Sequence, residues 1–219
     1  MTRALASGLV RFCCVLALLL LGSGFAAAQP ATPYIVRAEI DYRVIPAQPT
    51  DPRGPVEVID FFWYGCPYCY RLQPALERWI RGKPADVVVR RIPVILRDNW
   101  APHARIYYTL EALGEAERLH QQVYHGYHVE ELFMSRPEVM SDWAVRHGIA
   151  RERWDAAYQS AEVMRKVAEA ARLTRVYDVT GTPTLVVDGR YLTSGNMAET
   201  LDGLIPIVNG LVARVRAIR

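Results

Sequence analysis

Cysteine is scarce in this chain, which holds four among 219 residues: Cys13, Cys14, Cys66 and Cys69. A disulfide-rich scaffold, in which many bridges replace a core, is therefore excluded. The sequence also lacks internal repeats and low-complexity tracts, and its arginines are scattered rather than clustered. A repeat architecture and a nucleic-acid footprint are excluded on these grounds, and the formal charge of +3 implies no strongly charged partner.

The N-terminal segment has the layout of a secretory signal. Arg3 and Arg11 precede the hydrophobic run Phe12–Leu21, and small residues follow up to Ala28. This run has ten residues, whereas a membrane-spanning helix needs about 20, so an uncleaved anchor is the weaker interpretation. We expect residues 1–28 to be a signal peptide that is cleaved near Ala28, which leaves a soluble exported protein.

Cleavage there leaves one cysteine pair in the mature chain, Cys66 and Cys69. The formal charge falls to +1, because the removed segment contains two arginines and no acidic residue. A lone pair of cysteines in an oxidising compartment becomes the main candidate for chemistry.

The residues around this pair predict a β-α-β unit. Val56–Tyr64 is rich in β-branched and aromatic residues and is expected to form a buried central strand. A helix should begin near Cys66 and end near Trp79 or Arg81, and Val87–Ile92 should return as a parallel strand.

The remaining segments predict a helical block and a second β region. Four or five helices are expected between residues 101 and 178, with breaks near Gly114, at Gly126, at Arg136-Pro137 and at Gly148. Other expected elements are short edge strands at 34–37 and 42–45, a hairpin of 184–187 and 190–193 around Asp188-Gly189, and a helix over about 197–215. The fold class is α/β: a small domain of residues 29–98 and 179–219, interrupted by a helical insertion of residues 99–178.

Cys66-Pro67-Tyr68-Cys69 lies where the strand ends and the helix begins. Pro67 suits the first helical position, which places Cys66 at the N-cap. The sulfur of Cys66 then faces unpaired backbone N–H groups and the positive end of the helix dipole, which lower a cysteine pKa. Cys69 lies one turn further on, within reach of a disulfide with Cys66. We expect Cys66 to be the nucleophile and Cys69 to resolve its mixed disulfide.

Two other interpretations of the pair are weaker. An inert disulfide would close a very small ring and stabilise little, because stabilisation grows with loop length. A zinc site would add His125 and His128 to the two cysteines, but neither histidine lies in a zinc-binding motif, so no metal is expected. All five histidines are expected at the surface or its boundary, as are the strand arginines Arg90 and Arg91, which read as solvated edge positions.

The segment from Phe61 through Cys69, the helical block and Gly181-Thr182-Pro183-Thr184 together resemble the DsbA family of the thioredoxin superfamily. The similarity covers nearly all of the expected mature chain. It implies a thioredoxin fold with an inserted α-helical domain, a location in the periplasm, and donation of a disulfide to newly exported proteins. It also implies that the redox-active disulfide replaces any bound cofactor.

The resemblance carries over further site residues. Pro183 matches the cis-proline that faces the cysteine pair, and Thr182 precedes it. Asp60 lies six residues before Cys66, where relatives place a buried acid, and a carboxyl in an apolar strand has a raised pKa that suits proton transfer with Cys69. The alternative for Asp60 is an acid that is turned to water at the end of the strand.

Tyr68 departs from the family pattern, because the best-known relatives have histidine there. Tyrosine supplies a hydroxyl group but no cation beside the thiolate. We therefore expect a couple that still oxidises substrates, but less strongly than its histidine counterpart.

The leading hypothesis is a monomeric dithiol oxidase that acts on reduced, unfolded exported proteins and is reoxidised by a membrane quinone-linked partner resembling DsbB. An isomerase or reductase is the alternative within the same chemistry. Exported isomerases usually carry an N-terminal dimerisation domain, and only 37 residues separate the expected mature start from Cys66. A peptide-binding module, in which the cysteines are secondary, is the alternative from another class.

Overall fold

The structure, a computed structural model, describes residues 34–219, so the expected signal peptide, Cys13 and Cys14 lie outside the described residues. The elements are, in chain order, β1 (Arg43–Val44), β2 (Val56–Phe62), α2 (Pro67–Gly82), β3 (Val87–Pro93), the 3₁₀ turn η1 (Asp98–Trp100), α3 (Ala101–Ala112), α4 (Ala116–His128), α5 (Pro137–Arg146), α6 (Arg151–Tyr158), α7 (Ala161–Val176), β4 (Thr184–Val187), β5 (Tyr191–Ser194), the 3₁₀ turn η2 (Leu201–Gly203) and α8 (Leu204–Ile218). No helix in residues 34–219 has the length and hydrophobicity to cross a bilayer.

The strands form one sheet in the order β1-β5-β4-β2-β3. β2 and β3 are parallel, with Val56 opposite Val87, and the other neighbouring pairs are antiparallel. The parallel pair confirms the predicted β-α-β unit around α2. β2 has neighbours on both sides, and every residue in it except Glu57 is buried, which explains its β-branched and aromatic composition.

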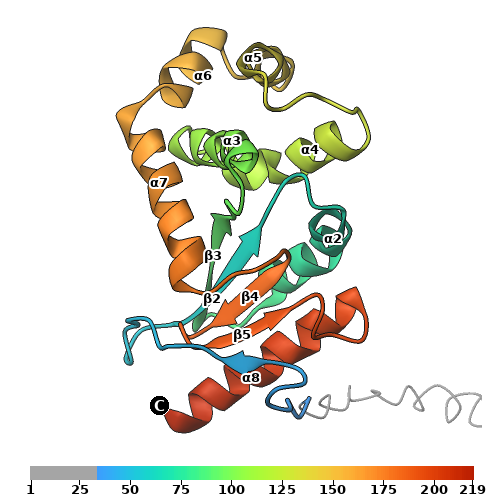
Figure 1. Cartoon of the computed structure of the whole chain (residues 1–219), viewed down its shortest axis with the longest axis vertical. Coiled ribbons are helices and arrows are strands. Elements are labelled where there is room, and N and C mark those ends of the chain that lie inside the picture. The colour runs from blue at the N-terminus through green and yellow to red at the C-terminus, as the bar shows by residue number, and fades with distance from the viewer. Residues whose placement is uncertain (1–33) are drawn as a thin grey trace, which may run out of the picture. The chain divides into compact units, whose positions relative to one another are not determined.

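The two faces of the sheet pack against different helices. Val56 and Val58 share a hydrophobic cluster with buried residues of α2 and α8. Ile59 and Phe61 belong to the other cluster, which contains the buried residues of the helical segment α3–α7. In Figure 1, α8 runs along the sheet, whereas α3 to α6 gather beyond one end of the strands. Alternate residues of β2 therefore face opposite layers, as the period of two requires, and Asp60 lies on the α2 side.

The helical segment enters between β3 and β4, which confirms the predicted interruption of the α/β part; the exact domain boundaries stay a prediction. The predicted break at Gly126 is wrong, because α4 continues to His128. A Cβ atom on Gly126 would lie 3.1 Å from Leu132 Cδ1 and 3.3 Å from Trp143 Nε1. This glycine serves close packing rather than a turn.

The β4–β5 hairpin has the predicted Asp188-Gly189 turn, with φ values of 54° and 65°. Two positive φ angles in succession are typical of a type I′ turn. The expected strand at 34–37 is not formed; there the Arg37 N–H donates to the Asp41 carboxylate at 2.7 Å. The last helix starts at Leu204 rather than near residue 197, because η2 comes first.

Candidate active site

The end of β2 and the start of α2 place the first cysteine. Cys66 is the N-cap of α2, with φ −86° and ψ 116°, and Pro67 occupies the first turn of the helix. The Cys69 N–H donates to Cys66 Sγ at 3.4 Å. The predicted N-cap position is confirmed, because proline with its fixed φ starts the helix and the preceding side chain accepts the free amide. Both cysteines are free thiols here, which is the reduced form of the pair.

The surroundings of the two thiols shift their pKa values in opposite directions. The pKa of Cys66 is lowered to about 6 by the hydrogen bond with the Cys69 thiol, then by Thr182 and the backbone N–H groups of Cys69 and Tyr68, against the opposing effect of burial. The pKa of Cys69 is raised well above its ordinary value by burial and, second, by Cys66. Near neutral pH the first sulfur is therefore a thiolate and the second remains a thiol.

The segment before β4 lies against Cys66. The peptide bond between Thr182 and Pro183 is cis, and the Cys66 thiol donates to the Thr182 carbonyl oxygen at 3.3 Å. Pro183 directly precedes β4, where its missing N–H removes no ladder hydrogen bond. The structure thus brings Thr182 and Pro183 to the cysteine pair, although 116 residues separate Thr182 from Cys66.

Asp60 is buried, with 1% of its surface exposed, so a carboxyl turned to water is excluded. Its Oδ2 atom has no hydrogen-bond partner among the described residues. Burial raises the pKa of Asp60 to about 7, Arg91 opposes the rise, and Glu77 adds to it. A buried carboxyl with this pKa can hold or release a proton near neutral pH.

Arg91 is a buried arginine that is paired with two carboxylates, one from α2 and one from α4. Its guanidinium contacts the carboxylates of Glu77 at 2.5 Å and Glu117 at 2.8 Å. The prediction of a solvated edge position is wrong for Arg91, which is 7% exposed, whereas Arg90 pairs with Glu57 at the surface. Consecutive residues of a strand point to opposite faces, and Arg91 points to the face that α2 covers.

A buried aromatic and polar cluster that sequence reasoning missed adjoins the cysteines. The Tyr64 hydroxyl and His120 Nδ1 are 2.9 Å apart, and both residues are buried, as are Tyr124 and His103. The prediction that all histidines lie at the surface or its boundary is therefore wrong for His103 and His120. Tyr64, two residues before Cys66, was the only available signal; nothing in the sequence pairs it with a histidine 56 residues later.

The arrangement of side chains does not match the zinc alternative. Within residues 34–219, no three His, Cys, Asp or Glu side chains gather closely enough to hold a metal ion. His128 Nε2 lies 2.8 Å from the Tyr64 carbonyl oxygen, and His125 is exposed.

Tyr68 is 54% exposed beside the pair, and the Arg71 guanidinium lies 4.7 Å from its ring centroid. Both residues line a groove of about 840 Å³, which also includes Thr182 and Pro183 and continues over the residues between β5 and α8. The later start of α8 leaves residues 195–202 free to form this wall. The cysteine pair therefore opens beside a concave surface that is large enough for a peptide segment.

Comparison with known proteins places the chain in a family. The family model of the DSBA-like thioredoxin domain matches residues 85–205, a range that does not include the cysteines. The thiol:disulfide interchange protein DsbA of Burkholderia cepacia is 32% identical over 198 residues, 90% of this chain and 92% of the relative. A match of that extent includes the cysteine pair. The chain belongs to the DsbA family.

Solved structures agree with this assignment. The crystal structure of Pseudomonas aeruginosa DsbA has a TM-score of 0.79 at 30% identity and covers 84% of this chain and 96% of its own. DsbA from Xylella fastidiosa has a TM-score of 0.75 at 28% identity, with coverages of 81% and 96%. The fold is therefore a DsbA-type thioredoxin fold with the helical insertion, as expected, and the protein is a thiol:disulfide oxidoreductase.

Proposed function

We propose that this DsbA-family protein is an exported dithiol oxidase that donates a Cys66–Cys69 disulfide to newly translocated proteins. The proposal is based on the difference between the pKa values of the two cysteines. The pKa of Cys66 is lowered to about 6 and that of Cys69 is raised. A thiol of low pKa leaves faster from a disulfide, and a stabilised thiolate favours the reduced form, so the couple gives up its disulfide readily.

The reaction proceeds by two exchanges. A substrate thiolate attacks Cys66 Sγ, the Cys66–Cys69 bond breaks, and Cys69 leaves as a thiolate that takes up a proton. A second substrate thiolate then attacks the substrate sulfur of the mixed disulfide, which releases Cys66 as a thiolate and forms the substrate disulfide. Two substrate thiols are oxidised and one protein disulfide is reduced.

Asp60 is the proposed proton donor to Cys69 in the first exchange. Its carboxyl is buried, and its pKa of about 7 leaves a substantial protonated fraction at neutral pH. Cys69, with its raised pKa, requires a proton when it leaves. A donor whose pKa lies near the working pH is the most efficient kind.

Substrate binding is assigned to the groove beside Tyr68. Pro183 cannot donate a ladder hydrogen bond, so the backbone ahead of β4 is open to pairing with an extended substrate segment. Thr182 and Pro183 line the groove, and the Thr182 carbonyl oxygen lies 3.3 Å from Cys66 Sγ. A peptide paired there would present its cysteine to Cys66 Sγ.

The cellular setting follows from the family assignment. We propose that residues 1–28 direct the chain to the periplasm and are removed, that the mature protein works as a monomer, and that a quinone-linked membrane partner resembling DsbB reoxidises it. Residues 29–98 and 179–219 are assigned to the thioredoxin-like domain and 99–178 to the inserted helical domain. No cofactor beyond the disulfide takes part in the proposed reaction.

The test uses a reduced, unfolded substrate and the oxidised protein. Cys66→Ser is expected to abolish oxidation. Cys69→Ser, whose Cys66 is first converted to a mixed disulfide with glutathione by glutathione disulfide, is expected to exchange with a substrate thiolate, which releases glutathione and leaves a mixed disulfide between Cys66 and the substrate, visible by non-reducing electrophoresis. Retained oxidation in Cys66→Ser would refute the proposal. The equilibrium with glutathione separates an oxidase from an isomerase or reductase, because the position of the couple differs among them.

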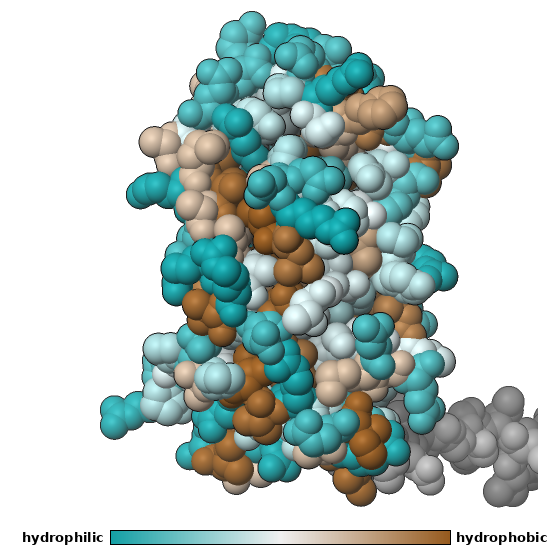
Figure 2. Space-filling model, viewed as in Figure 1, coloured by the Kyte–Doolittle hydropathy of each residue, from teal (hydrophilic) through white to brown (hydrophobic). Residues whose placement is uncertain are grey.

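A peptide-binding module remains the second candidate function. In Figure 2, hydrophobic residues form a band over the middle of the displayed face, bordered by hydrophilic residues. Such patches often mark sites of protein contact. Affinity for an unfolded chain that Cys66→Ser leaves unchanged, together with absent oxidation by the wild type, would favour this function over the oxidase.

A further inference from the structure

Helix α4 holds the loop that carries the reactive cysteine. This loop, residues 63–65, joins β2 to the N-cap, and Tyr64 in it is contacted at both ends. The Tyr64 hydroxyl meets His120 Nδ1 at 2.9 Å, and the Tyr64 carbonyl oxygen meets His128 Nε2 at 2.8 Å. The two histidines are eight residues apart on α4, so they lie near one side of the helix. One helix of the inserted segment thus fixes the residue two positions before Cys66.

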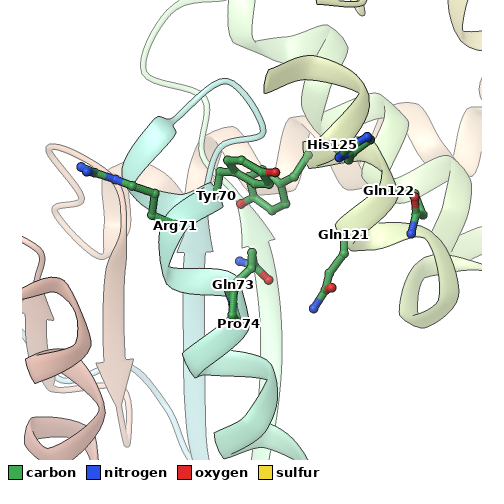
Figure 3. Close-up of a pocket in the computed structure, with 8 residues that line it drawn as sticks. Tyr70, Arg71, Gln73, Pro74, Gln121, Gln122 and His125 are labelled. Atoms are coloured by element: carbon green, nitrogen blue, oxygen red, sulfur yellow. The ribbon is translucent and has the colours of Figure 1, made fainter. Parts of the chain in front are cut away.

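His128 also contacts α2 on the other side of the cysteine. Its ring is stacked on Tyr70 at a centroid distance of 4.9 Å and an interplanar angle of 7°. Tyr70 lies in the first turn of α2, and its N–H donates to the Cys66 carbonyl oxygen at 3.1 Å. Figure 3 shows Tyr70 on the side of α2 that faces α4, next to a hollow of about 480 Å³ that His125 also lines. His128 therefore bridges residues before and after Cys66.

The hydrogen bond to Tyr64 defines the tautomer of His128. A carbonyl oxygen only accepts, so Nε2 carries the proton and donates it. Burial lowers the pKa of His128, and the hydrogen bond to Tyr64 opposes that effect. The neutral imidazole is thus a fixed donor to the loop, with its planar face against Tyr70.

We propose that His128 is a positioning residue for the exchange reaction, which holds Cys66 Sγ in place against the Cys69 N–H. The 3.4 Å contact between Sγ and the Cys69 N–H depends on where the loop sets the N-cap residue. Electrostatic stabilisation by an amide weakens steeply with distance and angle, so a small loop shift raises the Cys66 pKa. The role rests on Cys66 being the reacting cysteine of the proposed function.

Two variants distinguish the contribution of the His128 hydrogen bond from that of ring packing. His128→Phe keeps a planar ring against Tyr70 but removes the donor, whereas His128→Gln keeps an N–H near the position of Nε2 and removes the ring. His147→Phe is the matched control, because His147 is also stacked on an aromatic ring, that of Trp143 at 4.1 Å, and its Nδ1 also lies 2.8 Å from a backbone carbonyl oxygen. His147 follows α5, and its side chain contacts Trp143 of that helix.

The measurement is the pH dependence of Cys66 alkylation in the reduced proteins, with thermal unfolding in parallel. His128→Phe is expected to raise the Cys66 pKa and to slow alkylation about two- to fivefold at pH values below 6, where the rate follows the small thiolate fraction, because part of the free energy of one hydrogen bond then no longer stabilises the thiolate. His128→Gln is expected to keep the wild-type pKa. His147→Phe is expected to keep it too, even where its melting temperature falls as far as that of His128→Phe.

An unchanged Cys66 pKa in folded His128→Phe overturns the positioning role. A pKa raised equally by His128→Gln, or by His147→Phe, also overturns it, because the effect then belongs to ring packing or to general destabilisation. If His128→Phe does not fold, His128→Leu, which also lacks the donor, replaces it: a raised Cys66 pKa supports the role and an unchanged one contradicts it. Alkylation needs no protein substrate, so this outcome is independent of whether the chain proves to be an oxidase.

Discussion

Asp60→Asn is a sharp test of the buried acid in β2. The change is nearly isosteric and removes only the ionisable group. The pKa of Asp60 rises from 3.8 to about 7 on burial. At 1.36 kcal/mol per pKa unit, the ionised carboxyl is disfavoured in the folded state by about 4 kcal/mol.

The sign of the pH dependence follows from proton binding. Between the unfolded pKa and the folded pKa of about 7, the folded protein holds a proton on Asp60 that the unfolded chain has released. Wild-type stability therefore falls as pH rises through this window and levels off above it. Asp60→Asn lacks this fall, so the variant should gain on the wild type by up to about 4 kcal/mol from acidic to mildly alkaline pH.

Urea unfolding of the reduced proteins at a series of pH values measures this difference directly. The amide of the variant is buried without hydrogen-bond partners, which lowers its free energy of unfolding. This loss does not vary with pH. Glu57→Gln is the matched control, because it replaces a partly exposed carboxylate of the same strand that is paired with Arg90. Parallel pH profiles for the wild type and Asp60→Asn would show that Asp60 is not buried as described.

Three further changes have expected outcomes. Tyr68→His adds a cation beside Cys66 and is expected to lower its pKa and shift the glutathione equilibrium toward a more oxidising couple; an unchanged equilibrium would show that this position does not tune the thiolate. Gly65→Ala places a Cβ 2.3 Å from Trp63 Cζ2 and is expected to destabilise by about 1–3 kcal/mol in urea unfolding, whereas wild-type stability would contradict the packing. Arg91→Met leaves the partly buried Glu77 carboxylate without its cation and is expected to lower the unfolding free energy by about 1–3 kcal/mol; a loss below about 0.5 kcal/mol would mean that this carboxylate is well solvated.

The parts of the site that were predictable from sequence depend on short-range rules. Pro67 after Cys66 sets the N-cap because proline belongs in the first turn of a helix. Asp188-Gly189 sets the hairpin because both residues adopt positive φ with little strain. Pro183 depended on the family resemblance, since a proline before a strand does not by itself predict a cis bond.

The parts of the fold and the site that were not predictable depend on contacts between segments that are distant in the sequence. His120 is buried because Tyr64, from another element, supplies a hydrogen bond, and Arg91 is buried because two carboxylates neutralise it. Gly126 reads as a helix breaker, yet its small size lets α4 approach Leu132. No local sequence pattern identifies these interaction partners. Tertiary packing therefore overrides the usual preference of histidine and arginine for the surface and the usual tendency of glycine to end a helix.

The most direct test of the central claim is the pKa of Cys66 in the reduced protein. The rise in thiolate absorbance in the ultraviolet is followed across pH, with Cys66→Ser as the blank. Cys69 does not interfere, because its own pKa is raised well above the ordinary value. A midpoint of about 6 is expected. A midpoint near about 8.5, the value of an unperturbed cysteine, would contradict a thiolate held by the start of α2.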